Sequence, residues 1–163
     1  MARWMHIPGL QRLMVWAIYL TVPRHLMGVN LVVLNENGQI LLLKHVFHPY
    51  APWGLPGGWL NRGEDPQDCA LRELREETGL TAVLDRVLVL QRNSELSQLG
   101  AVYLAFAQTQ PFQLSGEIIE ARWFDPDALP QPLTAITQQA IATAVTCPLP
   151  TSPATKRDTI LTP

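Results

Sequence analysis

The chain has 163 residues, of which 47% are hydrophobic, and it carries a formal net charge of −2. This length suits one domain with a real core. A weakly acidic chain without a basic run argues against a nucleic-acid polymer as partner. Its two cysteines, Cys69 and Cys147, are too few for a disulfide framework. We therefore expect reduced thiols and a cytoplasmic protein.

Residues 1–27 are read as an N-terminal apolar extension. The run Leu10–Leu20 predicts a helix, and the uncharged part Leu13–Val22 is shorter than the roughly 20 residues that cross a bilayer. Trp16 and Tyr19 are costly to leave in water, so something must cover this helix. The sequence leaves three covers open. They are the domain itself, a second copy in a homodimer, or a membrane surface on which the helix lies as a peripheral contact.

A β-hairpin is predicted next. Gly28–Leu34 and Gln39–His45 are apolar runs of strand length, and the Asn37-Gly38 dipeptide between them is a strong hairpin signal. The second run is apolar without alternation, which indicates a strand buried on both faces. A turn-forming stretch, Trp53–Gly58, then leads into a charged segment.

This charged segment predicts a helix over Pro66–Thr78. Asp65 can cap the free amides at its start, and Pro66 fits the first helical position because its missing N–H is not needed there. Gly79 can adopt the left-handed conformation that ends a helix. The boundaries of this helix are therefore fixed by local residues.

Three carboxylates share one face of this helix. Glu73, Glu76 and Glu77 are related by three and four positions, and Arg72 is expected on the opposite flank. The carboxylates repel one another, and a divalent cation among them would relieve the repulsion. Hard carboxylate oxygens suit Mg²⁺, with Mn²⁺ as the alternative. An ordinary acidic surface helix is the competing interpretation.

The second half of the chain alternates strands and loops before a last helix. Short strands are predicted over Ala82–Leu84 and Val87–Gln91, and a polar loop over Arg92–Leu99. Further strands are predicted over Ala101–Ala107 and Ile118–Phe124. A helix over Thr134–Val145 follows, and residues 148–163 predict a disordered tail. The pattern predicts an α/β domain over residues 28–147, with a mixed sheet between helices.

The spacing of the charged segment adds a stronger signal. It reads as a glycine, five residues, a glutamate, seven residues, and then a dense terminal group, namely Gly58, Glu64, Arg72-Glu73-Leu74, Glu76-Glu77 and Gly79-Leu80. This spacing matches every fixed position of the Nudix box, so the chain resembles the Nudix (MutT-like) hydrolases. The resemblance covers about residues 28–145. It implies the Nudix fold, an α/β/α sandwich, and metal-dependent hydrolysis of a nucleoside diphosphate linked to another group.

The resemblance also implies roles for individual residues. Glu73 and Glu77 would be the main metal ligands, with Glu76 as a third, either directly or through water, and the Gly58 carbonyl as a further ligand. Arg72 would orient the carboxylates, and Glu64 would support the loop or an outer metal shell. A general base often comes from a loop after the box in this family. Glu117 and Glu120 are the candidates here, and Glu117 leads because it comes just before a strand.

The substrate remains open at this stage. A nucleoside triphosphate and a nucleoside diphosphate sugar both fit the resemblance, as does a non-catalytic module that senses a nucleotide. Trp53 and Trp123 could stack on a base, although core packing is expected for both. His45 and His48 are expected near the mouth of the site, in structural rather than catalytic roles.

Overall fold

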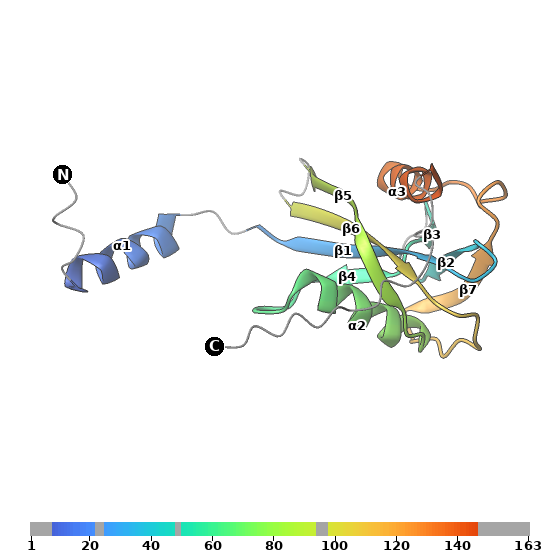
Figure 1. Ribbon diagram of the computed structural model, residues 1–163, viewed down its shortest axis with the longest axis horizontal. Helices are drawn as coiled ribbons and strands as arrows, with labels where there is room; N and C mark the ends of the chain where they lie inside the picture. The colour runs from blue at the N-terminus through green and yellow to red at the C-terminus, as the bar shows by residue number, and fades with distance from the viewer. Residues whose placement is uncertain (1–7, 22–24, 48–49, 94–97, 147–163) are drawn as a thin grey trace, which may run out of the picture.

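A computed structural model describes residues 8–21, 25–47, 50–93 and 98–146 of the chain. Its centre is a seven-stranded sheet in which five strands follow the order β3-β2-β1-β6-β5, while β4 pairs with β1 and β7 pairs with β2 (Figure 1). The two longest pairings have opposite senses. Strand β1 (Met27–Leu34) runs parallel to β6 (Gln98–Phe106), and β5 (Val83–Asn93) runs antiparallel to β6. The sheet is therefore mixed, as predicted.

Each face of the sheet is covered by one helix. Helix α2 (Pro66–Thr78) packs on one face through Cys69, Ala70 and Leu74, and α3 (Ala135–Thr146) packs on the other through Ala140, Ile141 and Ala144. The two helices lie on opposite sides of the strands in Figure 1. The domain is an α/β/α sandwich, which confirms the predicted fold class.

The strand β2 (Ile40–His45) shows why its sequence lacks alternation. Leu41 and Leu43 belong to the core under α2, whereas Ile40 and Leu42 belong to the core under α3. All four side chains are fully buried. Burial of each contributes about 1.5–3 kcal/mol to folding. A strand that supplies two cores must be apolar at every position, as the sequence predicted.

The remaining short strands position the loop before α2. Strand β3 (Trp53–Gly54) pairs with β2, and β4 (Gly57–Trp59) pairs with β1 in the register Asn30 to Gly57. Gly57 has a φ of 155°, and a Cβ atom there would lie 2.2 Å from the Val29 carbonyl oxygen. Only glycine lets β4 pass this close to β1.

Two predictions on the strands after α2 are wrong. Residues 83–93 form one strand, β5, instead of two, because register shifts at Leu84/Arg86 and Val87/Val89 absorb the polar Asp85-Arg86 pair without ending the strand. The predicted loop over residues 92–99 is shorter, since β5 and β6 extend into it from both sides. By contrast, β7 (Ile118–Phe124) has the predicted boundaries.

The predicted first helix is present as α1 (Pro8–Thr21). Its described side chains from residue 11 onward are exposed, apart from Tyr19, whose side chain is not described. The domain therefore does not cover those side chains in this structure. None of the described helices is long and apolar enough to cross a membrane. The predicted disordered tail, together with Cys147 and His48, lies outside the described residues.

Candidate active site

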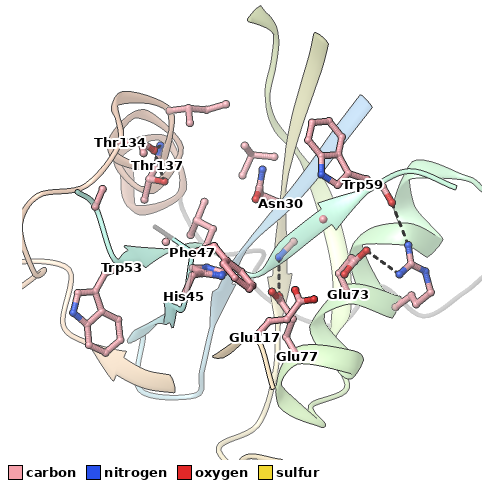
Figure 2. Close-up of a pocket in the computed structure, with 18 of the residues that line it drawn as sticks. Asn30, His45, Phe47, Trp53, Trp59, Glu73, Glu77, Glu117, Thr134 and Thr137 are labelled. Atoms are coloured by element: carbon pink, nitrogen blue, oxygen red, sulfur yellow. Dashed lines mark hydrogen bonds and ion pairs between the residues drawn. The ribbon is translucent and has the colours of Figure 1, made fainter. Parts of the chain in front are cut away.

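The site is a pocket of about 560 Å³ that is lined by residues of both helices that flank the sheet, α2 and α3. Its acidic side is formed by α2 and the loop before β7, and β4 supplies its glycine-rich floor. Its other side is formed by the start of α3 and by residues of β2 and β3 (Figure 2). Segments far apart in sequence thus meet in one cavity.

Local residues fix where helix α2, which lines this pocket, begins and ends. The Asp65 carboxylate accepts a hydrogen bond from the Gln67 N–H at 2.9 Å, and Pro66 occupies the first turn. Gly79 ends the helix in the left-handed region, with φ 75°, and its N–H donates to the Arg75 carbonyl. The helix therefore has the boundaries that its sequence predicted, and the phase of its carboxylates is set by these caps.

Glu77 is the most deeply buried carboxylate of the pocket, with 7% of its surface exposed. Its Oε2 atom accepts a hydrogen bond from the Gly57 N–H at 2.9 Å. Burial, together with the charges of Glu73, Glu117 and Glu76, raises the pKa of Glu77 to about 8 despite this hydrogen bond. The ionised form of Glu77 thus needs a compensating positive charge.

Glu73 lies against the backbone of Gly58. A Cβ atom at Gly58 would lie 2.4 Å from the Glu73 carboxylate carbon and 2.4 Å from its Oε1 atom. Any other residue at position 58 would push this carboxylate away. Glycine at position 58 therefore lets the carboxylate lie against the main chain, and a larger residue would displace the flexible end of Glu73.

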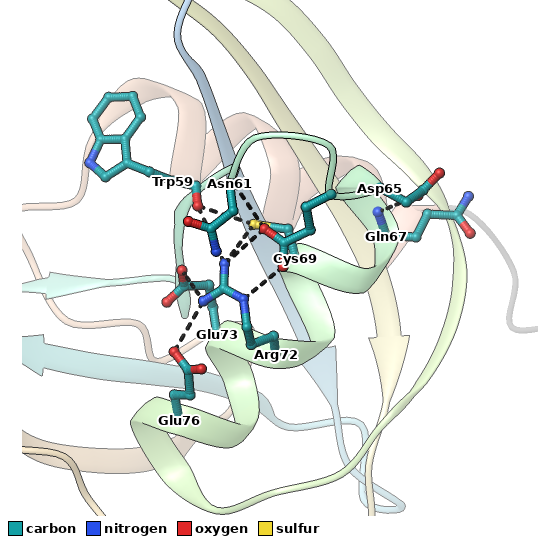
Figure 3. A network of polar contacts seen from close by, with 9 residues as sticks. Trp59, Asn61, Asp65, Gln67, Cys69, Arg72, Glu73 and Glu76 are labelled. Atoms are coloured by element: carbon teal, nitrogen blue, oxygen red, sulfur yellow. Dashed lines mark hydrogen bonds and ion pairs between the residues drawn. The ribbon is translucent and has the colours of Figure 1, made fainter.

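Arg72 connects the acidic residues around it (Figure 3). Its Nε donates to Glu64 at 2.7 Å, and its Nη1 donates to Glu73 at 2.8 Å and to Glu76 at 3.0 Å. Arg72 holds the pKa of Glu64 at about 2 through these hydrogen bonds, with the Asn61 N–H adding to the effect. The guanidinium thus fixes the directions of three carboxylates at once.

The sequence analysis placed Arg72 on the wrong flank of the helix. Arg72 and Glu76 are four residues apart, so they are neighbours on the helix surface. The long side chain then reaches across to Glu73 and lines the pocket. The predicted position of Arg72 is therefore wrong, and its predicted orienting role stays a prediction.

The two candidate bases are separated by the structure. Glu117 lines the pocket, and Figure 2 shows its side chain next to Glu77. Glu120 lies within β7, opposite Lys44 of β2, and pairs with Arg122 at 2.6 Å. Glu120 is absent from the pocket lining. The structure thus brings Glu117, but not Glu120, together with the carboxylates of α2.

Aromatic residues form the open sides of the pocket. Trp59 and Phe47 line it, and Trp59 is 54% exposed. Trp53 also lines it but packs edge-on against Phe124 at 5.0 Å, whereas Trp123 packs against Phe112 and is absent from the lining. The sequence analysis missed Trp59 and Phe47. The position of Trp59 directly after Gly57-Gly58 was a signal that could have identified it.

Two further polar residues of the lining come from β1 and β2. His45 is part of the pocket wall, as expected from its position near the site mouth. Asn30 also lines the pocket and was missed, although a single amide within the apolar strand β1 was a visible signal. These residues add hydrogen-bonding groups to the pocket lining (Figure 2).

The carboxylate oxygens fit a hard divalent cation in their chemistry. Among the described residues, no three histidine, cysteine, aspartate or glutamate side chains converge closely enough to enclose an ion. However, Glu73, Glu76 and Glu117 all raise the pKa of the buried Glu77, so their like charges interact in this space. A divalent cation bound by oxygen would remove this repulsion, as Mg²⁺ does at carboxylate sites.

The fold and this pocket define a class of protein, the hydrolases that act on phosphate anhydrides with carboxylates carried by a capped helix. The chain belongs to the Nudix family, because a sequence model of the NUDIX domain matches residues 24–144. It is a Nudix pyrophosphohydrolase that acts on nucleoside diphosphate derivatives. Members of the family generally use a divalent metal, typically Mg²⁺.

Individual relatives agree with this assignment. A protein of Bacillus subtilis (strain 168) named "Putative 8-oxo-dGTP diphosphatase" is 35% identical over 104 residues, which span 63% of this chain and 68% of the relative. The MutT NUDIX hydrolase from Burkholderia pseudomallei has a similar structure, with a TM-score of 0.60 and 28% identity over 74% of this chain and 98% of that one. The NUDIX domain of Shewanella oneidensis NrtR shares the fold, with a TM-score of 0.65 and 24% identity over 79% of this chain and 96% of that one.

Proposed function

We propose that the chain hydrolyses a diphosphate linkage in a nucleoside triphosphate or a nucleotide sugar. The observation that carries this proposal is the meeting of Glu73, Glu77 and Glu117 in one pocket whose open sides are aromatic. The acidic side suits a cation and the charged diphosphate. The aromatic side suits a base, since stacking on an aromatic ring stabilises a bound base by about 1–3 kcal/mol.

Each acidic residue has a separate part in this proposal. Glu73 and Glu77 would hold a divalent cation, together with Glu76, through water, and the Gly58 carbonyl. When bound, this cation would neutralise charge on the diphosphate and lower the pKa of the attacking water. Arg72 holds Glu73 and Glu76 in place. Glu117 would accept the proton of the water as it attacks phosphorus.

The triphosphate is the favoured substrate of the two. Its support is the Bacillus subtilis relative, whose name specifies 8-oxo-dGTP and whose sequence is 35% identical to the chain. Trp59 and Phe47 supply flat surfaces for the base, and the Asn30 amide can both donate to and accept from a base edge. A nucleotide sugar would instead carry its sugar ring beyond the diphosphate, on the side away from the base.

A nucleotide-sensing module without catalysis is the second candidate. It would need the nucleotide to bind without a reaction, and such a module has no use for the complete set of carboxylates. This chain keeps all of them, namely Glu64, Glu73, Glu76 and Glu77. The proposal of hydrolysis is therefore preferred.

The test is a panel of nucleoside triphosphates, including 8-oxo-dGTP, and of nucleotide sugars, each with Mg²⁺ or with Mn²⁺. Product masses identify the broken linkage, and ¹⁸O-labelled water identifies the phosphorus that is attacked. Release of pyrophosphate and a nucleoside monophosphate from a triphosphate would support the favoured substrate. Tight binding of a nucleotide without turnover, measured by calorimetry, would support the sensor instead.

A further inference from the structure

From Leu13 to Leu20, helix α1 is apolar all around its axis. Successive residues are about 100° apart on a helix, so Leu13, Trp16 and Leu20 face one side while Val15 and Ile18 face the other. All five are exposed, as is Met14 between the two groups. A helix that is hydrophobic on all sides is normally buried on all sides.

The charge of this segment has one sign. The first 35 residues contain three arginines, Arg3, Arg12 and Arg24, and no acidic residue. Because the whole chain carries −2, the remaining residues carry −5. The segment is thus a cationic, apolar unit attached to an acidic domain. A second copy of the same segment would meet it with like charge, whereas an anionic surface would attract it.

The dimensions of α1 restrict how it can be buried. Its 14 residues make a rod about 21 Å long, which is too short to cross a hydrocarbon core of about 30 Å. Its diameter with side chains is about 10–12 Å, so with its axis parallel to the membrane plane it fits within one leaflet of about 15 Å. There all of its sides contact lipid. A partner helix in a dimer would cover only one stripe of it.

We propose that α1 is buried in one leaflet of a membrane that contains anionic lipids, with its axis parallel to the membrane plane. The apolar side chains are then surrounded by acyl chains, and the Arg12 guanidinium reaches the headgroups. This contact attaches the hydrolase domain to the membrane surface without a membrane-spanning segment. It is independent of the pocket, because no residue of α1 lines it.

The test uses the full chain and vesicles of phosphatidylcholine and phosphatidylglycerol in equal parts. The protein bound after centrifugation is compared for wild type, Leu20→Glu, Trp16→Glu and the control Leu90→Glu. Leu20 and Leu90 are matched, since they are 79% and 67% exposed, but Leu90 lies in β5. Each α1 variant should weaken partition by about tenfold or more, from the lost burial of one large side chain. Leu90→Glu should partition like wild type.

Three controls make the result decisive. Vesicles of phosphatidylcholine alone should bind less wild type, and added salt should weaken binding to the anionic vesicles. Hydrolysis of a soluble nucleotide should be equal in wild type and both α1 variants, which shows that the variants are folded. Wild type that stays in the supernatant, or Leu20→Glu that binds like wild type, would overturn the proposal. So would a dimer in light scattering that Leu20→Glu converts to a monomer while vesicles bind neither protein.

Discussion

Helices α1 and α2 have nearly the same length, 14 and 13 residues, and opposite relations to the domain. Helix α2 is highly charged yet places Cys69, Ala70 and Leu74 fully inside the core. Helix α1 is far more apolar, yet its described apolar side chains are exposed. The comparison shows that the arrangement of apolar residues, more than their number, decides whether a helix packs on its own domain.

The two helices also differ in how their ends are defined. Helix α2 has a capping aspartate, a proline in its first turn and a left-handed glycine after its last turn. Helix α1 has no acidic residue in its first turn and no basic residue in its last turn. Caps set the phase of α2, and through it the directions of its carboxylates. The exact position of each carboxylate on α2 therefore depends on these caps.

The largest effect on turnover is expected from loss of the buried charge on α2, which has no counterpart on α1. Glu77→Gln should reduce turnover on the order of a thousandfold, because it removes a charged ligand of the cation. The fold should persist, since the glutamine carbonyl can still accept the Gly57 hydrogen bond. Steady-state rates at saturating Mg²⁺ and thermal unfolding test both points. Glu76→Gln, at a more exposed site, should cost less. A Glu77→Gln enzyme with wild-type turnover would refute the assignment.

The second effect concerns Glu117, which lies next to Glu77 in the pocket. Glu117→Gln should lower kcat by about a hundredfold to ten-thousandfold with little change in KM, as loss of a general base does. Glu120→Gln is the matched control, because it lies two strand positions beyond β7's first residue and pairs with Arg122. If both variants are nearly fully active, the proton is accepted by another group.

A smaller effect is expected from the backbone that α2 contacts. Gly58→Ala would place a methyl group against the Glu73 carboxylate, and the side chain would have to move. We expect activity to fall by about tenfold to a hundredfold, as for other changes that misplace a metal ligand. Gly116→Ala is the control, since nothing lies within 4 Å of its Cβ position. Equal activities of the two variants would show that the position of Glu73 is not critical.

The smallest effect is a pH dependence of stability. Arg72 lowers the pKa of Glu64 from 4.5 to about 2, so the folded state favours the ionised carboxylate. Its contribution to stability is complete above about pH 4.5 and is lost as the pH falls toward 2. In chelator-containing buffer, the Tm difference between wild type and Glu64→Gln should therefore shrink over this window. Curves that remain parallel from pH 5 to about pH 2 would show that Arg72 does not stabilise ionised Glu64.

The parts predicted best from sequence are those governed by neighbouring residues. The boundaries of α2 follow from Asp65, Pro66 and Gly79, and the double burial of β2 follows from its unbroken apolar run. The prediction failed at β5, where pairing with β6 carries the strand through Asp85-Arg86. It also misplaced Arg72, although Glu76 lies four residues further along the same helix and is therefore its neighbour on the helix surface. The first error depends on a contact between two strands, whereas the second lies within one helix.

The sequence by itself determined the family, the helix that carries the carboxylates, and the apolar character of α1. Those properties depend on residue types and short spacings, which a linear pattern records in full. Only the tertiary structure decided that Glu117, and not Glu120, faces Glu77, and that Trp59 and Asn30 line the same pocket. Strand pairing brings these residues together from separate segments. Their proximity therefore follows from the register of the sheet, which no short stretch of sequence contains.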